Sequence, residues 1–279
     1  MPPKSRPPGP GRSDGARSVR THLAGPCRQA ILPALVVGLL AWTAISHGVA
    51  ASSDRIEFTH RGVIILGVPP GPAADYDVPV MEAARAAEKI RAALDLLLDN
   101  SPEGAAALET LKDKGRVVIG YVPAFPAEDA ATWGARLAAF VPDLLADAPG
   151  ARGGKDFPVV VGRYIVQWKT EELAVVLAHE LLGHGRQHLL GRLESMSLRD
   201  RECEASLYEE MARQHLGLDK HSELAVSFRR ALEWRWCVPF KEYLTRQAPE
   251  KMALWNAIDP DVPELQAAFE DYLRATGGR

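Results

Sequence analysis

Cysteine is scarce in this chain, and neither sign of charge is in large excess. Its 279 residues include three cysteines, at positions 27, 203 and 237, and no CxxC pair. So few cysteines exclude a disulfide framework, and the missing pair argues against a cysteine-ligated zinc ion. The net charge of −3 lacks the basic field with which a protein displaces counterions from phosphates, so no nucleic-acid partner is expected. The sequence has neither an internal repeat nor a heptad run.

The first 51 residues differ in composition from the rest. Residues 1–29 are rich in Pro, Gly and Arg, and we expect them to be disordered because they cannot bury enough apolar surface to offset their ordering entropy. An apolar run at 30–45 and small residues at 48–51 follow. A basic region, an apolar core and small residues in this order are typical of a secretory signal peptide, with cleavage expected after Ala50 or Ala51.

Residues 30–51 have two other interpretations. One is an uncleaved membrane anchor, since the apolar run approaches the roughly 20 residues that a spanning helix needs; the other is a buried core helix. A signal peptide or an anchor places residues 52–279 outside the cytoplasm. The protein is then expected to be periplasmic or secreted, or held at the membrane by its N-terminal segment. In such a compartment Cys203 and Cys237 could be oxidised to each other.

Residues 52–279 are expected to form one domain of the α+β class. Runs of β-branched and aromatic residues bounded by Pro and Gly predict strands, and apolar residues at helical spacing predict helices. The expected strands span 55–68, 116–122 and 158–168. The expected helices span 80–98, a short segment with Ser101 as its N-cap, 131–145, a helix from Thr170 through His184, and nearly all of the chain beyond Arg199. A flexible loop is expected at 149–154, and the tryptophans at 234 and 236 are expected to pack inside a small helical subdomain.

The candidate chemistry lies in the sequence HELLGH at His179–His184. The helix that leads into it is apolar on all sides, so a His-Glu pair at its end needs a partner that satisfies it. A metal ion would do so. Zinc in hydrolases takes three protein ligands and leaves a fourth position for water, whose pKa falls to about 7. We therefore expect Zn²⁺ as the cofactor.

The spacing of the two histidines requires a distorted helix. In the HExxH motif of zinc peptidases, histidines four residues apart lie about 40° apart on one helix face. His179 and His184 are five residues apart, which in a regular α-helix places them roughly 140° apart. A one-residue π-bulge at Leu182–Gly183 would restore the shared face, because Gly183 is the residue best suited to local distortion.

Two short motifs resemble those of the dipeptidyl-peptidase III family. HELLGH is similar to the zinc motif of that family, which has the same one-residue-longer spacing, and RECEAS at 201–206 is similar to its second motif, EECRAE. The resemblance implies one role, zinc ligand, for His179, His184 and Glu202. It implies another, the base that deprotonates the water, for Glu180. The first and last positions of the second motif are not acidic here, so what is implied is the wider class, a zincin-like domain with a small sheet packed on the active-site helix.

The sequence leaves a rival ligand set open. His188 lies four residues after His184 and could share its helix face. Glu180 lies on the same side of the helix, so Glu180, His184 and His188 would form a set of metal ligands that needs no π-bulge. Such a set leaves His179 without a role and makes Glu180 a ligand, so that no base remains.

Supporting residues are expected on the helix that carries Glu202. Ser206 and Glu209 fall on the same face as Glu202 and are candidates to hold the ligands in place, whereas Glu204 points away. The reaction would also need a group that stabilises the developing oxyanion. The candidates for it are Arg186, His188, Tyr208, His215 and His221.

The function expected from these residues is that of an exported zinc peptidase with a polypeptide or peptide substrate. Strand 159–168 would then be an edge strand that pairs with extended substrate, or else an ordinary core strand. A non-catalytic, metal-binding structural or adaptor protein of the cell envelope is the alternative. A third hypothesis is a membrane-anchored scaffold in which the motif is a coincidence of packing.

Overall fold

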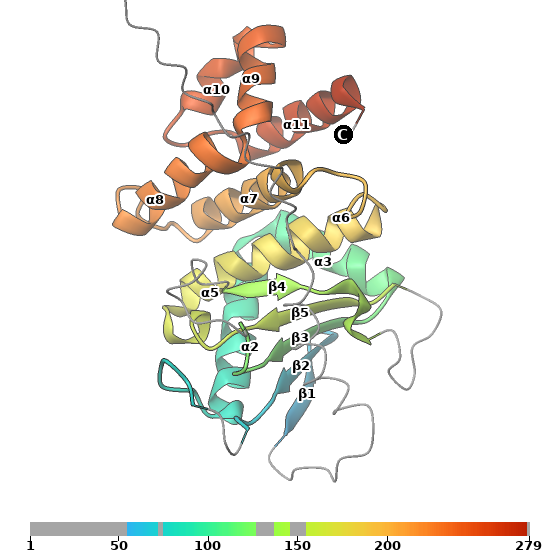
Figure 1. Cartoon of the computed structure of the whole chain (residues 1–279), viewed down its shortest axis with the longest axis vertical. Helices are drawn as coiled ribbons and strands as arrows, with labels where there is room; N and C mark the ends of the chain where they lie inside the picture. Colours follow the sequence, from blue (N-terminus) through green and yellow to red (C-terminus); the bar gives the residue numbers. More distant parts are fainter. Residues whose placement is uncertain (1–54, 72–74, 127–136, 146–154, 278–279) are drawn as a thin grey trace, which may run out of the picture.

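The protein is described from a computed structural model, which covers residues 55–71, 75–126, 137–145 and 155–277. The expectations for residues 1–29, for the apolar segment at 30–51 and for the loop at 149–154 lie outside these residues. The fold is α+β, as predicted: a mixed sheet is followed by a helical C-terminal region. In Figure 1 the sheet forms one end of the molecule and the last helices form the other, with the long helices of the middle of the chain between them.

The sheet has five strands in the order β1-β2-β3-β5-β4. Its central strands β2, β3 and β5 are parallel to one another, and the outer strands β1 and β4 pair antiparallel with their neighbours. Every residue of β3 and β5 is buried, as expected of strands covered on both faces. The bounds are β1 Ile56–His60, β2 Val63–Gly67, β3 Val117–Tyr121, β4 Ala138–Phe140 and β5 Phe157–Val161.

The single strand predicted at 55–68 is wrong, because the segment is the hairpin β1-β2. Its two-residue turn, Arg61-Gly62, has φ of 48° and 77°. Positive φ at both central residues is the requirement of the type I′ turn, whose twist matches that of the flanking strands. Glycine reaches this region without strain, and Arg61 is the one residue other than glycine that adopts it within the described residues.

Two further predictions near the sheet need correction. The strand predicted at 158–168 ends at Val161, and a 3₁₀ turn, η2 (Ile165–Gln167), follows. The described part of the helix predicted at 131–145 is instead β4 and a 3₁₀ turn, η1 (Pro142–Leu145). Proline disfavours the α conformation in the residue before it, so Val141 favours extended backbone.

The first helices cover the sheet and carry the chain to the functional region. Helix α2 (Ala83–Asn100) packs on β2, β3 and α5 (Thr170–Leu177), and α3 (Pro102–Lys114) follows it directly. Ser101 caps α3 as predicted, its Oγ accepting a hydrogen bond from the backbone N–H of Gly104 at 3.1 Å. Pro102 at the first helical position has no N–H that would need a partner.

The C-terminal region is helical, as predicted. After α5 the chain continues through a π-helix, η3 (Ala178–His184), and α6 (Gly185–Leu189) into the long α7 (Leu198–His215). The remaining elements are α8 (Glu223–Ala231), π-helix η4 (Leu232–Trp236), α9 (Val238–Gln247), η5 (Pro249–Lys251), α10 (Met252–Asn256) and α11 (Val262–Thr276). No helix within the described residues is both long and apolar enough to span a membrane.

Packing of the tryptophan-rich segment differs from the prediction. Trp234 is 80% exposed and Trp236 is partly buried. The aromatic core of the C-terminal region consists instead of Phe240, Trp255 and Phe269, with Phe240 in edge contact with both of the others. Trp234 lies at an exposed position of η4, so its large apolar surface adds nothing to this core.

A disulfide joins Cys203 of α7 to Cys237, the residue between η4 and α9. Both cysteines are buried, and their Cα atoms are 4.9 Å apart. Disulfides persist mainly in oxidising compartments outside the cytoplasm, which agrees with the expected export. The bond also ties the first half of α7 to the C-terminal helices.

Candidate metal centre

The helix that carries HELLGH is distorted as the spacing predicts. Ala178–His184 form a π-helix, and the backbone N–H of Gly185 donates to the carbonyl oxygen of Glu180, five residues earlier. The extra residue in this turn brings the two histidines to the same side, and their ring centroids lie 4.9 Å apart. The predicted bulge is confirmed.

Gly183 was expected to permit the distortion of its own helix, and the structure shows that it also permits close packing against α7. A Cβ atom on this residue would lie 2.5 Å from both Cα and Cβ of Ala205 in α7, well inside normal carbon contact distance. The missing side chain therefore allows η3 and α7 to pack almost backbone to backbone. Because Glu202 lies one turn before Ala205, this close approach also brings Glu202 up to the histidines.

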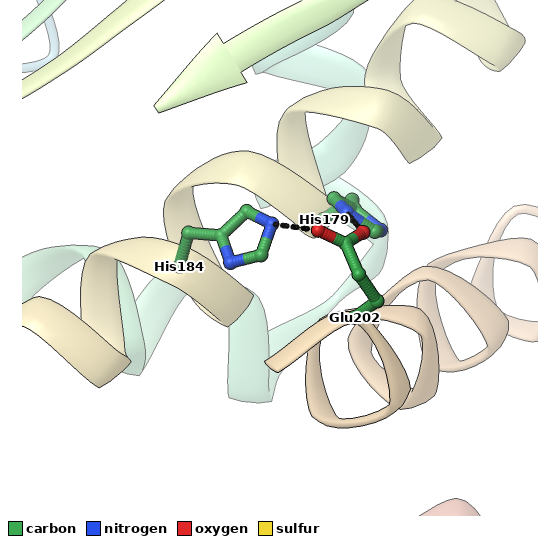
Figure 2. A group of neighbouring side chains, drawn as sticks. All are labelled: His179, His184 and Glu202. Atoms are coloured by element: carbon green, nitrogen blue, oxygen red, sulfur yellow. Dashed lines mark ion pairs between the residues drawn. The ribbon is translucent and has the colours of Figure 1, made fainter. Parts of the chain in front are cut away.

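Three side chains converge where η3 meets α7. His179 Nε2 is 3.5 Å from Glu202 Oε2, and His184 Nε2 is 3.8 Å from Glu202 Oε1. Figure 2 shows the carboxylate of Glu202 reaching from α7 toward both imidazole rings. One ligand atom from each residue lies within 4.8 Å of the other two, so the group could hold a metal ion. The side chains retain 12–23% exposure, which leaves the group within reach of solvent.

The second nitrogen of each histidine contacts another side chain. His184 Nδ1 hydrogen bonds with Gln187 Oε1 at 2.9 Å, and His179 Nδ1 makes an ion-pair contact of 3.2 Å with Glu209 Oε2. In this way both rings direct Nε2 toward Glu202. Metal-binding histidines typically have one ring nitrogen on the metal and the other on a carboxylate, a carbonyl or water. The donor set and its surroundings fit a metal ion.

Glu209 belongs to a chain of charges. Its Oε1 accepts a hydrogen bond from Arg213 Nη2 at 3.0 Å, and Arg213 Nη1 lies 3.3 Å from Glu172 Oε2. Arg213 is almost fully buried, so these carboxylates compensate its charge. The network fixes the carboxylate that faces His179.

The electrostatics of the group differ between its members. Burial lowers the pKa of His179, but hydrogen bonding to Glu202 and Glu209 and the charge of Glu180 outweigh this effect and raise it well above its ordinary value. Burial raises the pKa of Glu202, and hydrogen bonding to His179 with nearby positive charge more than reverses this, so its pKa is lowered. Burial lowers the pKa of His184, which favours a neutral ring.

Glu180 lies next to β4, the strand at the edge of the sheet. It is buried, and its Oε2 accepts a hydrogen bond of 2.7 Å from the backbone N–H of Phe140 in β4. The charge of Glu180 acts on both His179 and His184. One carboxylate oxygen is therefore held by the edge strand, while the group stays electrostatically coupled to the histidines.

His188 is separate from the three converging residues. Its ring packs against Phe140 and Phe157, with ring centroids 5.6 and 5.8 Å apart. The group that could hold a metal consists of His179, His184 and Glu202 and does not include it. The structure brings His188 to the sheet.

Most residues suggested as oxyanion donors also have other partners. Arg186 Nη1 donates to Tyr208 Oη at 2.9 Å and pairs with Glu204 at 3.5 Å. His215 Nδ1 hydrogen bonds with Ser101 Oγ at 2.9 Å. Glu204, predicted to point away from the ligand face, is indeed in the Arg186 cluster, and burial raises its pKa. Ser206 is buried in α7, and His221 is exposed.

Sequence reasoning missed two residues around the histidines. Gln187 and Arg213 are both buried polar side chains, and neither belongs to a motif. The only sequence signal for Gln187 is its position three residues after His184, a spacing at which helical side chains meet. Arg213 likewise follows Glu209 by four residues.

Comparison of the chain with protein-family models, with curated proteins and with solved structures finds no match. The functional argument therefore rests on the geometry of this group of residues.

Proposed function

We propose that this protein is an exported zinc-dependent peptidase of the zincin type. The observation that carries the proposal is the convergence of His179 Nε2, His184 Nε2 and the Glu202 carboxylate within 4.8 Å on a π-helix. Two imidazoles and one carboxylate are a donor set that zinc hydrolases use, with a fourth position left for water. Zinc with an open position activates a water molecule, and the His₂Glu set with an adjacent Glu is the arrangement of zinc hydrolases, so hydrolysis is the reaction class that we infer.

In this proposal His179, His184 and Glu202 would hold the zinc ion. When bound, zinc supplies Lewis acidity and lowers the pKa of a water molecule. Glu180 accepts the proton of the attacking water and passes it to the leaving amine. The backbone N–H of Phe140, 2.7 Å from Glu180 Oε2, orients the carboxylate for this transfer and leaves its other oxygen for the water.

The edge strand β4 supports a peptide as substrate. The backbone N–H of Val141 donates to Pro158 and the carbonyl oxygen of Leu137 accepts from Gly162, both in the direction of β5. Backbone groups alternate in direction along a strand, so those of Ala138 and Phe140 face the outer edge, on the side of Glu180. An extended peptide could add to this edge as a further strand with its backbone beside the proposed base.

Strand 159–168 was expected to be either an edge strand that pairs with substrate or an ordinary core strand. β5 has neighbours on both sides, β3 and β4, so it has no free edge and is a core strand. Among the described strands, the one at the edge of the sheet that contacts η3 is β4, and on that edge the N–H of Phe140 already bonds to Glu180.

A second candidate function is a metal-binding protein without catalysis. It is favoured by the hydrogen bond that already occupies one oxygen of Glu180. A purely structural zinc site, however, normally has four protein ligands. Within the described residues, the group that could hold a metal offers three.

The test compares wild type with Glu180→Gln. Glutamine keeps the shape and the acceptor for the Phe140 N–H but has no basicity, so zinc content should stay at the wild-type level while cleavage of a peptide library falls by at least about a thousandfold. Wild-type cleavage should stop with chelator and return with zinc. If wild type binds zinc and cleaves no peptide, the non-catalytic function is correct. Full activity in the variant would contradict the role of Glu180.

A further inference from the structure

A buried amide links two of the three proposed zinc ligands. Gln187, in α6, is fully buried. Its Oε1 lies 2.9 Å from His184 Nδ1, and its Nε2 donates to the carbonyl oxygen of Arg201 at 2.8 Å. Arg201 directly precedes Glu202 in α7. Both ends of one side chain are thus engaged, one with a ligand histidine and the other with the backbone beside the ligand carboxylate.

The partners of Gln187 determine which way its amide faces. A carbonyl oxygen accepts hydrogen bonds but cannot donate, so the group that faces Arg201 must be the NH₂. The amide oxygen therefore faces His184 and can only accept. It follows that Nδ1 of His184 carries a proton, which in the neutral ring leaves the lone pair on Nε2.

We propose that Gln187 is a positioning residue that holds His184 in the Nδ1–H tautomer and fixes its ring relative to the α7 backbone at Glu202. This inference rests on the metal site of the proposed function and goes beyond it, because it assigns the orientation of the site to a residue outside the motif. The two histidines are held differently: His179 faces the carboxylate of Glu209, whereas His184 faces a neutral amide.

The amide is suited to this position because it must both donate and accept. Leucine has a similar size and can do neither. Glutamate could accept from His184 Nδ1, and it could donate to the Arg201 carbonyl oxygen if it were protonated, as burial favours. Gln187→Leu therefore removes the hold on the ring, and Gln187→Glu retains the contact with His184.

The experiment measures two properties of the purified full chain with Gln187→Leu, with Gln187→Glu and with the control Tyr272→Phe. Tyr272 donates a buried hydrogen bond of 2.7 Å to Asp200 at the start of α7, so the control loses a buried contact of the same helix that involves neither Gln187 nor any of the three ligands. The first property is the tautomer of His184 in metal-free protein, from ¹⁵N NMR shifts of its ring. The second is the Kd for zinc, from competition with a chromophoric chelator.

We expect the Nδ1–H tautomer in wild type, in Tyr272→Phe and in Gln187→Glu, and its loss in Gln187→Leu. The Kd for zinc should rise about 10- to 100-fold in Gln187→Leu and less in the other two. An Nε2–H tautomer in wild type, or a folded Gln187→Leu with the zinc affinity of the control, would overturn the inference.

The same measurements separate this inference from the proposed function. If wild type binds zinc with the expected tautomer but cleaves no peptide, the peptidase is wrong and the role of Gln187 stands. If wild type does not bind zinc, the metal site and the role of Gln187 both fail. If Gln187→Leu does not fold, Gln187→Glu decides, because loss of the Nδ1–H tautomer there would contradict the argument.

Discussion

Replacement of Gly183 by alanine tests how the fold builds the metal site. The added Cβ would lie 2.5 Å from Cα and Cβ of Ala205, whereas carbon atoms in contact are normally about 3.5–4.0 Å apart. Both neighbours belong to or adjoin the backbone of α7, so relief requires the two helices to separate by about 1 Å. Overpacking of this kind costs about 1–3 kcal/mol, partly offset by about 1 kcal/mol from the better helix propensity of alanine.

We expect Gly183→Ala to be less stable to urea in the metal-free state by up to about 2 kcal/mol, the difference between these effects. The Kd for zinc should rise at least about tenfold, because Glu202 moves away with α7. Gly185→Ala is a matched control two residues later. Its Cβ would meet the end of the Leu111 side chain at 3.2 Å, which can shift, so stability should change by less than about 1 kcal/mol. Equal stability and zinc affinity in the two variants would refute the reasoning.

Three further predictions concern the disulfide, the pH dependence of stability and the pH dependence of zinc binding. Reduction of Cys203–Cys237, whose residues are 34 apart in sequence, should lower the free energy of unfolding by about 3–4 kcal/mol, measured in urea with and without reductant; an unchanged midpoint would contradict it. In the presence of chelator, the lowered pKa of Glu202 means that this residue stabilises the fold at pH values above about 4.3, the ordinary pKa of a glutamate. This contribution to stability is lost as the pH falls through the lowered pKa. The raised pKa of His179 means that this residue stabilises the fold at pH values below about 6.5, and this contribution is lost as the pH rises through the raised pKa. The two residues together therefore stabilise the fold most between about pH 4.3 and 6.5. Zinc affinity should instead increase as the pH rises above about 6.5, because the proton leaves His179 only as the pH approaches its raised pKa; a flat profile would count against His179 as a ligand.

The sequence was sufficient to predict part of the local geometry of the site. Five-residue spacing and the geometry of a helix require a π-turn if His179 and His184 are to share a metal, and the structure has that turn. The second motif suggested Glu202, which lies against both histidines. The π-turn could be predicted because neighbouring positions on a helix are determined by spacing alone. Glu202 lies on a separate helix, α7, and only the motif resemblance pointed to it.

Contacts between distant segments could not be predicted in the same way. The hydrogen bond from Phe140 to Glu180 joins residues 40 apart in sequence, and residues 137–145 had been predicted to be helical. The hairpin at Arg61-Gly62 was missed because both strands are rich in β-branched and aromatic residues and Arg-Gly is not one of the strong turn dipeptides. The importance of Gly183 depends on Ala205 of another helix, which no local pattern of η3 contains.

The most direct test of the account is the zinc content of the purified protein and of single alanine variants at the proposed ligands. We predict one zinc ion per chain in wild type and in His188→Ala, and its loss in His179→Ala, His184→Ala and Glu202→Ala. If no metal is bound, a protonated His179 between Glu202 and Glu209 would compensate the negative charges of these two carboxylates. Wild type that holds no stoichiometric zinc after dialysis against it, or zinc retained in His184→Ala, would contradict the central claim.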